Sequence, residues 1–291
     1  MILRARAVVT MDGAPLSDGA VVIANRTIAA IGSWKEIARH HTGEILNLGE
    51  CALMPGLINA HCHLDYTELR GAILPPVSFT AWIRAINARK AAWSEADYAR
   101  SIATGFAEAR GFGTTSVVNL EAAPNVITKL DSVPLRTWWM AEMIDLRERV
   151  SPAGLLKSLP GRVGLAPHAP YTASAELYAA TARTGAEQNL LLATHLAESS
   201  EEMQMFADAD GPLFEFVKSI GRPMEDCGGT TPLRVLLDAK VLDDGWIVAH
   251  LNELTESDFA ALQDPPHFHI AHCPRSHAYF GHTRFAFERL K

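Results

Sequence analysis

Residues 57–65 read Leu-Ile-Asn-Ala-His-Cys-His-Leu-Asp and directly follow a Met-Pro-Gly turn that can lead the chain into a buried strand. Successive side chains of a strand alternate between its faces, so we expect His61 and His63 on one side, close enough to share a metal ion. Cys62 is expected to point away from them. Imidazole nitrogens bind zinc well, but a catalytic zinc site usually has three protein ligands plus water. A lone pair of histidines can equally serve hydrogen bonding, so the metal hypothesis depends on further ligands elsewhere in the chain.

The composition is that of a globular protein with a substantial core: 291 residues, of which 48% are hydrophobic and 20% charged. The formal net charge is −7 and there is no basic tract, which argues against nucleic acid and favours small molecules as partners. We recognise neither a leader segment nor an apolar run long enough to span a membrane. The four cysteines lack C-x-x-C spacing and fit a reduced, cytoplasmic chain. A homodimer is left open.

The pattern of apolar residues along the chain changes near residue 55. Residues 1 to about 50 hold short apolar runs separated by turns, which predicts a small β module over residues 1–54. Over residues 55–291, apolar strand-like runs alternate with helical stretches, the pattern of βα units around a parallel sheet, either a barrel or a doubly wound fold. The segment from Ser199 to about Lys240 is long enough to carry extra helices. The main helices are predicted at 79–92, 95–110 and Ala173–Glu187, and the seven strands at Leu57–His63, Thr115–Leu120, Leu135–Glu142, Arg162–His168, Leu190–His195, Trp246–His250 and Phe268–His272.

Four of the later predicted strands end in a histidine: His168, His195, His250 and His272. In a parallel barrel the carboxyl ends of all strands lie on one face, where barrel enzymes keep their active sites. Each histidine alone is more often a hydrogen-bonding residue than a metal ligand, but chance would scatter them between both ends of the strands. Glu198 lies three residues after His195, where a carboxylate could move protons beside a metal. A glutamate that merely opens a surface helix would look the same.

Together these motifs resemble the metal-dependent amidohydrolase superfamily, in the branch that includes cytosine, guanine, S-adenosylhomocysteine and aminofutalosine deaminases and the triazine hydrolases. The resemblance covers essentially the whole chain. It implies an α/β fold, a (β/α)8 TIM barrel with a small N-terminal β-sandwich module. The matching motifs are Pro-Gly-Leu-Ile-Asn-Ala-His-Cys-His at 55–63, Pro-His-Ala-Pro-Tyr at 167–171, His-Leu-Ala-Glu at 195–198, His250, and His-Cys-Pro at 272–274.

The resemblance also implies a role for each site residue. His61, His63 and His195 would bind one divalent metal, with zinc as the expected ion and iron or manganese as alternatives. Glu198 would shuttle protons, and His250 would hydrogen-bond the metal-bound hydroxide or the forming intermediate. The residues expected to form the substrate pocket are Trp82, His168, Arg275, Ser276 and His277.

One part of the family pattern is missing from this sequence. The family carries a further metal-site aspartate at the end of the eighth barrel strand and then returns to complete the β module. No aspartate follows the seventh predicted strand here. The barrel is therefore expected to lack its last βα unit. A shortened gene model, a cloned fragment and a natural short form are all left open.

The function that the resemblance implies is hydrolytic deamination of an aminopurine nucleoside or related N-heterocycle. Metal-activated water would attack a ring carbon that bears an amino group, and ammonia would leave. One alternative is a triazine-type hydrolase with a halide or amine leaving group; turnover of adenosine-like compounds against chlorotriazines separates the two. Another is a catalytically impaired binding form that lacks the barrel-closing aspartate, which would bind a nucleoside tightly without releasing ammonia.

Overall fold

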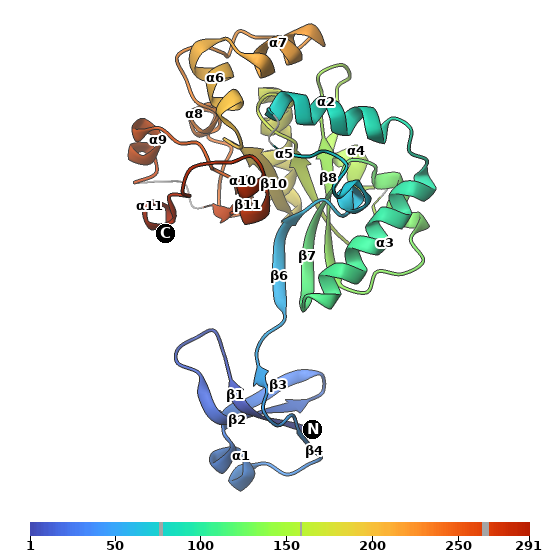
Figure 1. Ribbon diagram of the computed structural model, residues 1–291, viewed down its shortest axis with the longest axis vertical. Coiled ribbons are helices and arrows are strands. Elements are labelled where there is room, and N and C mark those ends of the chain that lie inside the picture. The colour runs from blue at the N-terminus through green and yellow to red at the C-terminus, as the bar shows by residue number, and fades with distance from the viewer. Residues whose placement is uncertain (76–77, 158, 264–267) are drawn as a thin grey trace. The chain divides into compact units, whose positions relative to one another are not determined.

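The computed structural model describes residues 1–75, 78–157, 159–263 and 268–291. The chain divides into two compact units, residues 1–57 and 58–291 (Figure 1). The first unit is built on a five-stranded sheet and the second on a seven-stranded sheet. In these described ranges, none of the helices combines the length and apolar character that crossing a membrane requires.

The first unit is a mixed sheet with one helix. Strands β1 and β2 pair antiparallel with Ile2 opposite Val22, whereas β1 and β4 pair in parallel. Alternation along the strands places Ile2 and Val22 in an apolar cluster with Ile37 of the helix. The predicted β module is thus present, as one mixed sheet with one helix. Its elements are β1 Ile2–Val8, β2 Leu16–Ala24, β3 Thr27–Ser33, α1 Trp34–His40, β4 Ile45–Asn47 and β5 Ala52–Leu53.

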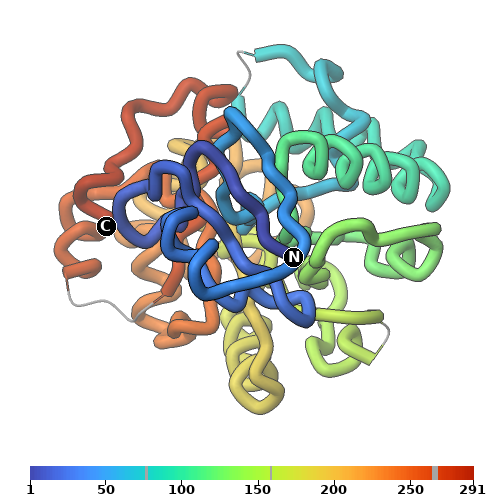
Figure 2. Tube along the Cα trace, turned by 90° about the horizontal axis from the view of Figure 1, so that it is seen from below, coloured from blue at the N-terminus to red at the C-terminus, as the bar shows by residue number. Residues whose placement is uncertain are grey.

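The second unit is a nearly closed barrel of parallel strands, in which every strand neighbours the next one in chain order. Within the described residues, β6 and β12 are the two ends of this order. Helices of the second unit are seen around its periphery in Figure 2. The strands are β6 Leu57–Cys62, β7 Thr114–Glu121, β8 Arg136–Met143, β9 Arg162–Pro167, β10 Leu191–Leu196, β11 Trp246–His250 and β12 His269–Ala271.

The helices of the second unit follow the strands in βα order, and three of them fill the long segment after β10 as the sequence predicted. Among these three, α7 buries Leu213, Phe214 and Val217. The helices are η1 Leu64–Leu69, α2 Phe79–Lys90, α3 Glu95–Gly111, η2 Pro124–Lys129, α4 Pro152–Leu156, α5 Ala175–Gln188, α6 Ser200–Asp208, α7 Pro212–Ser219, α8 Pro232–Asp238, α9 Glu256–Ala261, α10 Pro274–Tyr279 and α11 Phe287–Leu290, where η marks 3-10 helices.

The predicted strands agree with the observed ones to within one residue at each end, but three of the histidines predicted at strand ends lie just outside the strands. Strand β9 ends at Pro167, so His168 follows it. Strand β6 ends at Cys62, so His63 lies just beyond the strand, at the residue that precedes η1. Strand β12 covers only His269–Ala271 and stops before His272. The proline at the start of α10 follows two residues later, and the chain turns there into that helix. His272 is therefore not a strand residue, contrary to the prediction.

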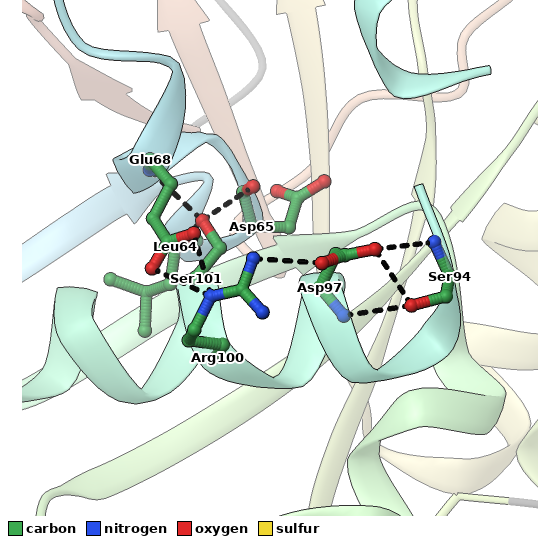
Figure 3. Close-up of polar contacts among 7 residues, drawn as sticks. All are labelled: Leu64, Asp65, Glu68, Ser94, Asp97, Arg100 and Ser101. Carbon is green, nitrogen blue, oxygen red and sulfur yellow. Dashed lines mark hydrogen bonds and ion pairs between the residues drawn. The ribbon is translucent and has the colours of Figure 1, made fainter. Parts of the chain in front are cut away.

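The segment that follows His63 is held against α3 by hydrogen bonds between its backbone and the Ser101 side chain (Figure 3). The Ser101 hydroxyl donates to the carbonyl of Asp65 at 2.8 Å and accepts the backbone N–H of Glu68 at 3.1 Å. Helix α3 itself begins with a capping box in which the Ser94 hydroxyl accepts the N–H of Asp97. These contacts hold η1 in place and so position the end of β6.

Candidate active site

Three histidines converge at the carboxyl ends of β6 and β10. His61 belongs to β6, His63 follows it, and His195 belongs to β10. Their ligand nitrogens all lie within 4.8 Å of one another. The Nε2 atoms of His63 and His195 are 3.0 Å apart, a separation that suits two nitrogens directed at one ion. The fold therefore brings together the three predicted metal ligands.

The tautomer of His195 is set by its backbone partner. Its Nδ1 lies 2.8 Å from the carbonyl oxygen of His168. A carbonyl can only accept, so Nδ1 carries the proton and Nε2 keeps a free lone pair facing His63. Burial lowers the pKa of His195 to about 4 and lowers the pKa values of His61 and His63 well below the usual range. Neutral imidazoles at pH 7 fit a late first-row divalent ion.

A buried carboxyl group lies beside the histidines. Glu198 follows β10 and is 7% exposed. Burial, and then the negative charge of Glu202, raise the pKa of Glu198 to about 8, so the group is mainly protonated at neutral pH. Its Oε1 lies 3.5 Å from Nε2 of His250 and 3.5 Å from the Ser276 hydroxyl. A group of this kind can both give and take a proton near pH 7.

The turns that carry these side chains use strained backbone. Ala197 has φ +50° and His250 has φ +77°, both in the left-handed region that favours glycine. Each lies at the end of a strand of the barrel. The Leu251 N–H donates to the Leu196 carbonyl at 2.9 Å, and the Asn252 N–H donates to the Ala197 carbonyl at 3.0 Å. These bonds hold the unusual conformation and keep both turns facing the cavity.

A cavity of about 920 Å³ opens over the histidines. One wall is aromatic and apolar, with Phe79 and Trp82 from α2 and Phe216 from α7. The ring centroids of Phe79 and Trp82 are 6.0 Å apart in a stacked arrangement. This volume lies in the range of small-molecule sites and far exceeds what a water or an ion needs. The cavity therefore suits a flat organic molecule with a substantial substituent.

The structure gathers most of the predicted site residues around this cavity. The cavity is lined by Trp82, His168, Ser276 and His250 together with the three converging histidines and Glu198. The Nδ1 of His168 pairs with the Thr172 hydroxyl at 2.6 Å, which orients its ring. Arg275 and His277 are not among the described residues that line it, and neither is His272. Instead, the His272 ring lies 5.1 Å from His277 and 4.0 Å from Phe285.

Sequence reasoning missed two polar features of the cavity wall. Glu142, near the end of β8, is partly buried, and burial raises its pKa; its Oε1 atom is buried without a hydrogen-bond partner among the described residues. Its position at a strand end is the same signal that singled out the histidines. Lys90 of α2 pairs with the buried carboxylate of Asp65 at 2.6 Å. No local sequence pattern predicts this pair, because Lys90 and Asp65 lie 25 positions apart in the sequence.

The strand ends of this parallel barrel carry converging neutral imidazoles and a buried carboxyl group. These features are typical of metal-binding barrel proteins. Comparison with known families places the chain within that class. The sequence model of the amidohydrolase family matches residues 52–291, and the chain belongs to this family, which is metal-dependent.

The chain is also similar to individual proteins in sequence and in structure. The aminodeoxyfutalosine deaminase of Deinococcus radiodurans is 27% identical over 290 residues, covering 91% of this chain but only 66% of that relative's length. The Helicobacter pylori aminofutalosine deaminase in complex with methylthio-coformycin has a TM-score of 0.82 at 18% identity, covering 99% of this chain and 73% of that one. An atrazine chlorohydrolase from Arthrobacter aurescens complexed with zinc has a TM-score of 0.78 at 18% identity, covering 99% and 69%. At these identities the two structures establish the shared fold.

Proposed function

We propose that the chain is a metal-dependent hydrolytic deaminase of an aminopurine nucleoside or a related N-heterocycle. The observation that carries the proposal is the pairing of neutral, converging histidines with a buried Glu198 whose pKa lies at about 8. Such a carboxyl group can alternate between acid and base at neutral pH, as deamination requires. The names of the Deinococcus relative and of the Helicobacter structure support the same chemistry.

His61, His63 and His195 are the proposed ligands of one divalent ion. Zinc fits three neutral imidazoles with an open position, and iron or manganese are alternatives. An ion bound there would supply Lewis-acid activation of water at neutral pH. His195 would bind through Nε2, since its Nδ1–H is held by the His168 carbonyl.

Glu198 would carry the protons in two exchanges. In the first it gives its proton to the ring nitrogen next to the reacting carbon and takes one from the attacking water. In the second it gives that proton to the amino nitrogen, which leaves as ammonia, and takes the hydroxyl proton as the carbonyl forms. The neutral ring of His250, 3.5 Å from Oε1 of Glu198, would hydrogen-bond the oxygen that is added.

The rest of the cavity would bind the substrate. Trp82 offers an aromatic face for a flat heterocycle, and His168 and Ser276 offer hydrogen bonds at its edge. Arg275 and His277, predicted for the same pocket, would have to act from outside the cavity lining. The four cysteines are free, which supports the proposed cytoplasmic location. A homodimer and the absence of nucleic-acid partners stay predictions.

Parallel turnover assays test the substrate class. We expect the zinc-loaded chain to release ammonia from adenosine-type nucleosides and to leave chlorotriazines unchanged, because a nucleoside matches the cavity and the proton exchanges of Glu198. Chloride release from chlorotriazines without ammonia release from any nucleoside would replace deamination with the triazine alternative. Tight nucleoside binding with no release would favour a binding protein.

A further inference from the structure

A second group of ligand atoms lies beside the first one. Cys273 follows β12 and lines the cavity. Its thiol and ring nitrogens of His61 and His250 all lie within 4.8 Å of one another. The thiol makes a weak contact, 3.7 Å from the carbonyl oxygen of Ala271. Two imidazoles and a sulfur thus form a second set of ligand atoms, which shares only His61 with the first set.

The ring nitrogens of His250 are buried polar atoms close to the Cys273 thiol. The residue is 3% exposed, and neither of its ring nitrogens has a hydrogen-bond partner in the described part of the chain. Nδ1 of His61 is likewise buried without one. Buried polar atoms without partners are costly, and native proteins satisfy nearly all of them. A ligand held between His61, His250 and Cys273 would give one ring nitrogen of His250 and one of His61 a partner.

We propose that His61, His250 and Cys273 form a second position for a thiophilic divalent cation, overlapping the first position through their shared His61. Two nitrogens and a thiolate are a donor set that zinc, cobalt and cadmium accept. Burial raises the pKa of the Cys273 thiol to about 12, but an ion bound to the sulfur displaces its proton. Because both groups draw on His61, they compete for one ion per chain.

The third nearby group does not compete in the same way. Glu142, His168 and His195 also offer ligand atoms within 4.8 Å. However, Nδ1 of His195 is bonded to the His168 carbonyl, so the only nitrogen it can offer is the one that already faces His63. That group therefore draws on the same His195 nitrogen as the first position, and it contains no sulfur.

Cobalt(II) distinguishes the two positions, because thiolate ligation gives an intense near-ultraviolet charge-transfer absorption that nitrogen ligation does not. We expect this absorption in the cobalt-loaded wild-type chain and its loss in Cys273→Ser. His63→Ala removes only the first position, so its bound cobalt should show a stronger absorption per ion than wild type. His195→Ala should do the same and guards against a folding defect particular to His63→Ala.

Cys62→Ser is the matched control. Its sulfur lies 3.5 Å from the carbonyl oxygen of Val118 and belongs to neither group. The absorption should be unchanged in this variant. Absorption that survives in Cys273→Ser, or cobalt-loaded His63→Ala and His195→Ala without any absorption, would overturn the second position. None of these readouts uses activity, so failure of the proposed deamination would leave this test intact.

Discussion

The Glu202 carboxylate accepts the backbone N–H of Glu198 at 2.7 Å and that of Ala197 at 3.2 Å. Glu202 is fully buried, and its own N–H is bound by the Ser199 hydroxyl at the start of α6. One carboxylate therefore holds the strained turn that aims Glu198 into the cavity. Its negative charge also contributes to the raised pKa of Glu198. Glu202 is thus a positioning residue for the proposed proton shuttle.

Glu202→Gln should lower kcat and move the pH profile while leaving the bound metal in place. Removing the charge lowers the pKa of Glu198 from about 8, since the charge raises it. If the protonated form starts the reaction, the fall of activity on the alkaline side should then move to lower pH. The measurement is the pH dependence of ammonia release, with metal content determined alongside.

Glu201→Gln is the control for that experiment. The Glu201 carboxylate accepts the backbone N–H groups of Phe79 and Thr80 at the start of α2, away from the turn of Glu198. We expect it to change stability without moving the pH profile. An alkaline limb that moves equally in both variants would show that Glu202 has no specific influence on Glu198.

His61→Ala should remove the divalent ion from the chain. His61 is the one histidine shared by the nitrogen group and the thiol-containing group, so its loss disrupts both. Elemental analysis of the purified protein gives the metal content, and circular dichroism checks the fold. His272→Ala is the matched control and should retain the ion, because His272 lies with His277 and Phe285 outside the cavity lining. Equal metal content in His61→Ala and wild type would refute the ligand assignment.

The buried pair of Lys90 and Asp65 should be important for stability. The side chains are 11% and 1% exposed. Lys90→Met leaves a buried carboxyl group without its cation and should cost about 3–5 kcal/mol in the free energy of unfolding above pH 7. Burial already raises the pKa of Asp65 to about 6, and loss of Lys90 raises it further. The cost should therefore shrink as pH falls and Asp65 becomes protonated. Denaturant unfolding at several pH values measures this.

Two further variants test whether burial of the Lys90–Asp65 pair causes this loss of stability. Lys90→Met combined with Asp65→Asn should recover part of the loss, because the uncompensated charge is removed. Arg100→Met breaks two surface pairs, with Glu68 and with Asp97, both visible in Figure 3, and should still cost far less, since exposed pairs are weak. If Arg100→Met proved as damaging as Lys90→Met, burial would not be the source of the effect.

Much of the barrel could be predicted because its strands are largely apolar runs with histidines at or near their carboxyl ends. Trp246–His250 is predicted and observed with the same bounds. By contrast, α1 was missed although Ser33 and Glu36 form a capping box. The capping residues were visible in the sequence, but the strand-like residues around them favoured a strand over a helix.

The parts of the site that escaped prediction depend on contacts across the fold. Spacing alone could not show that His272 turns away with α10 while Ser276 of the same segment faces Glu198. It also could not show that Glu202 binds the turn before α6. Both outcomes follow from where short elements end, and the ends of elements are the least regular part of a sequence pattern.

Ammonia release from adenosine-type nucleosides by the zinc-loaded chain, compared between wild type and Glu198→Gln, is the measurement closest to the proposed chemistry. Glutamine keeps the size of the side chain but can neither give nor take the proton. We expect wild type to release ammonia and the variant to be slower by about two to four orders of magnitude at equal zinc content. Equal rates in the two proteins would contradict the role of Glu198, and a wild-type chain that binds zinc but releases no ammonia from any nucleoside would contradict the deaminase assignment.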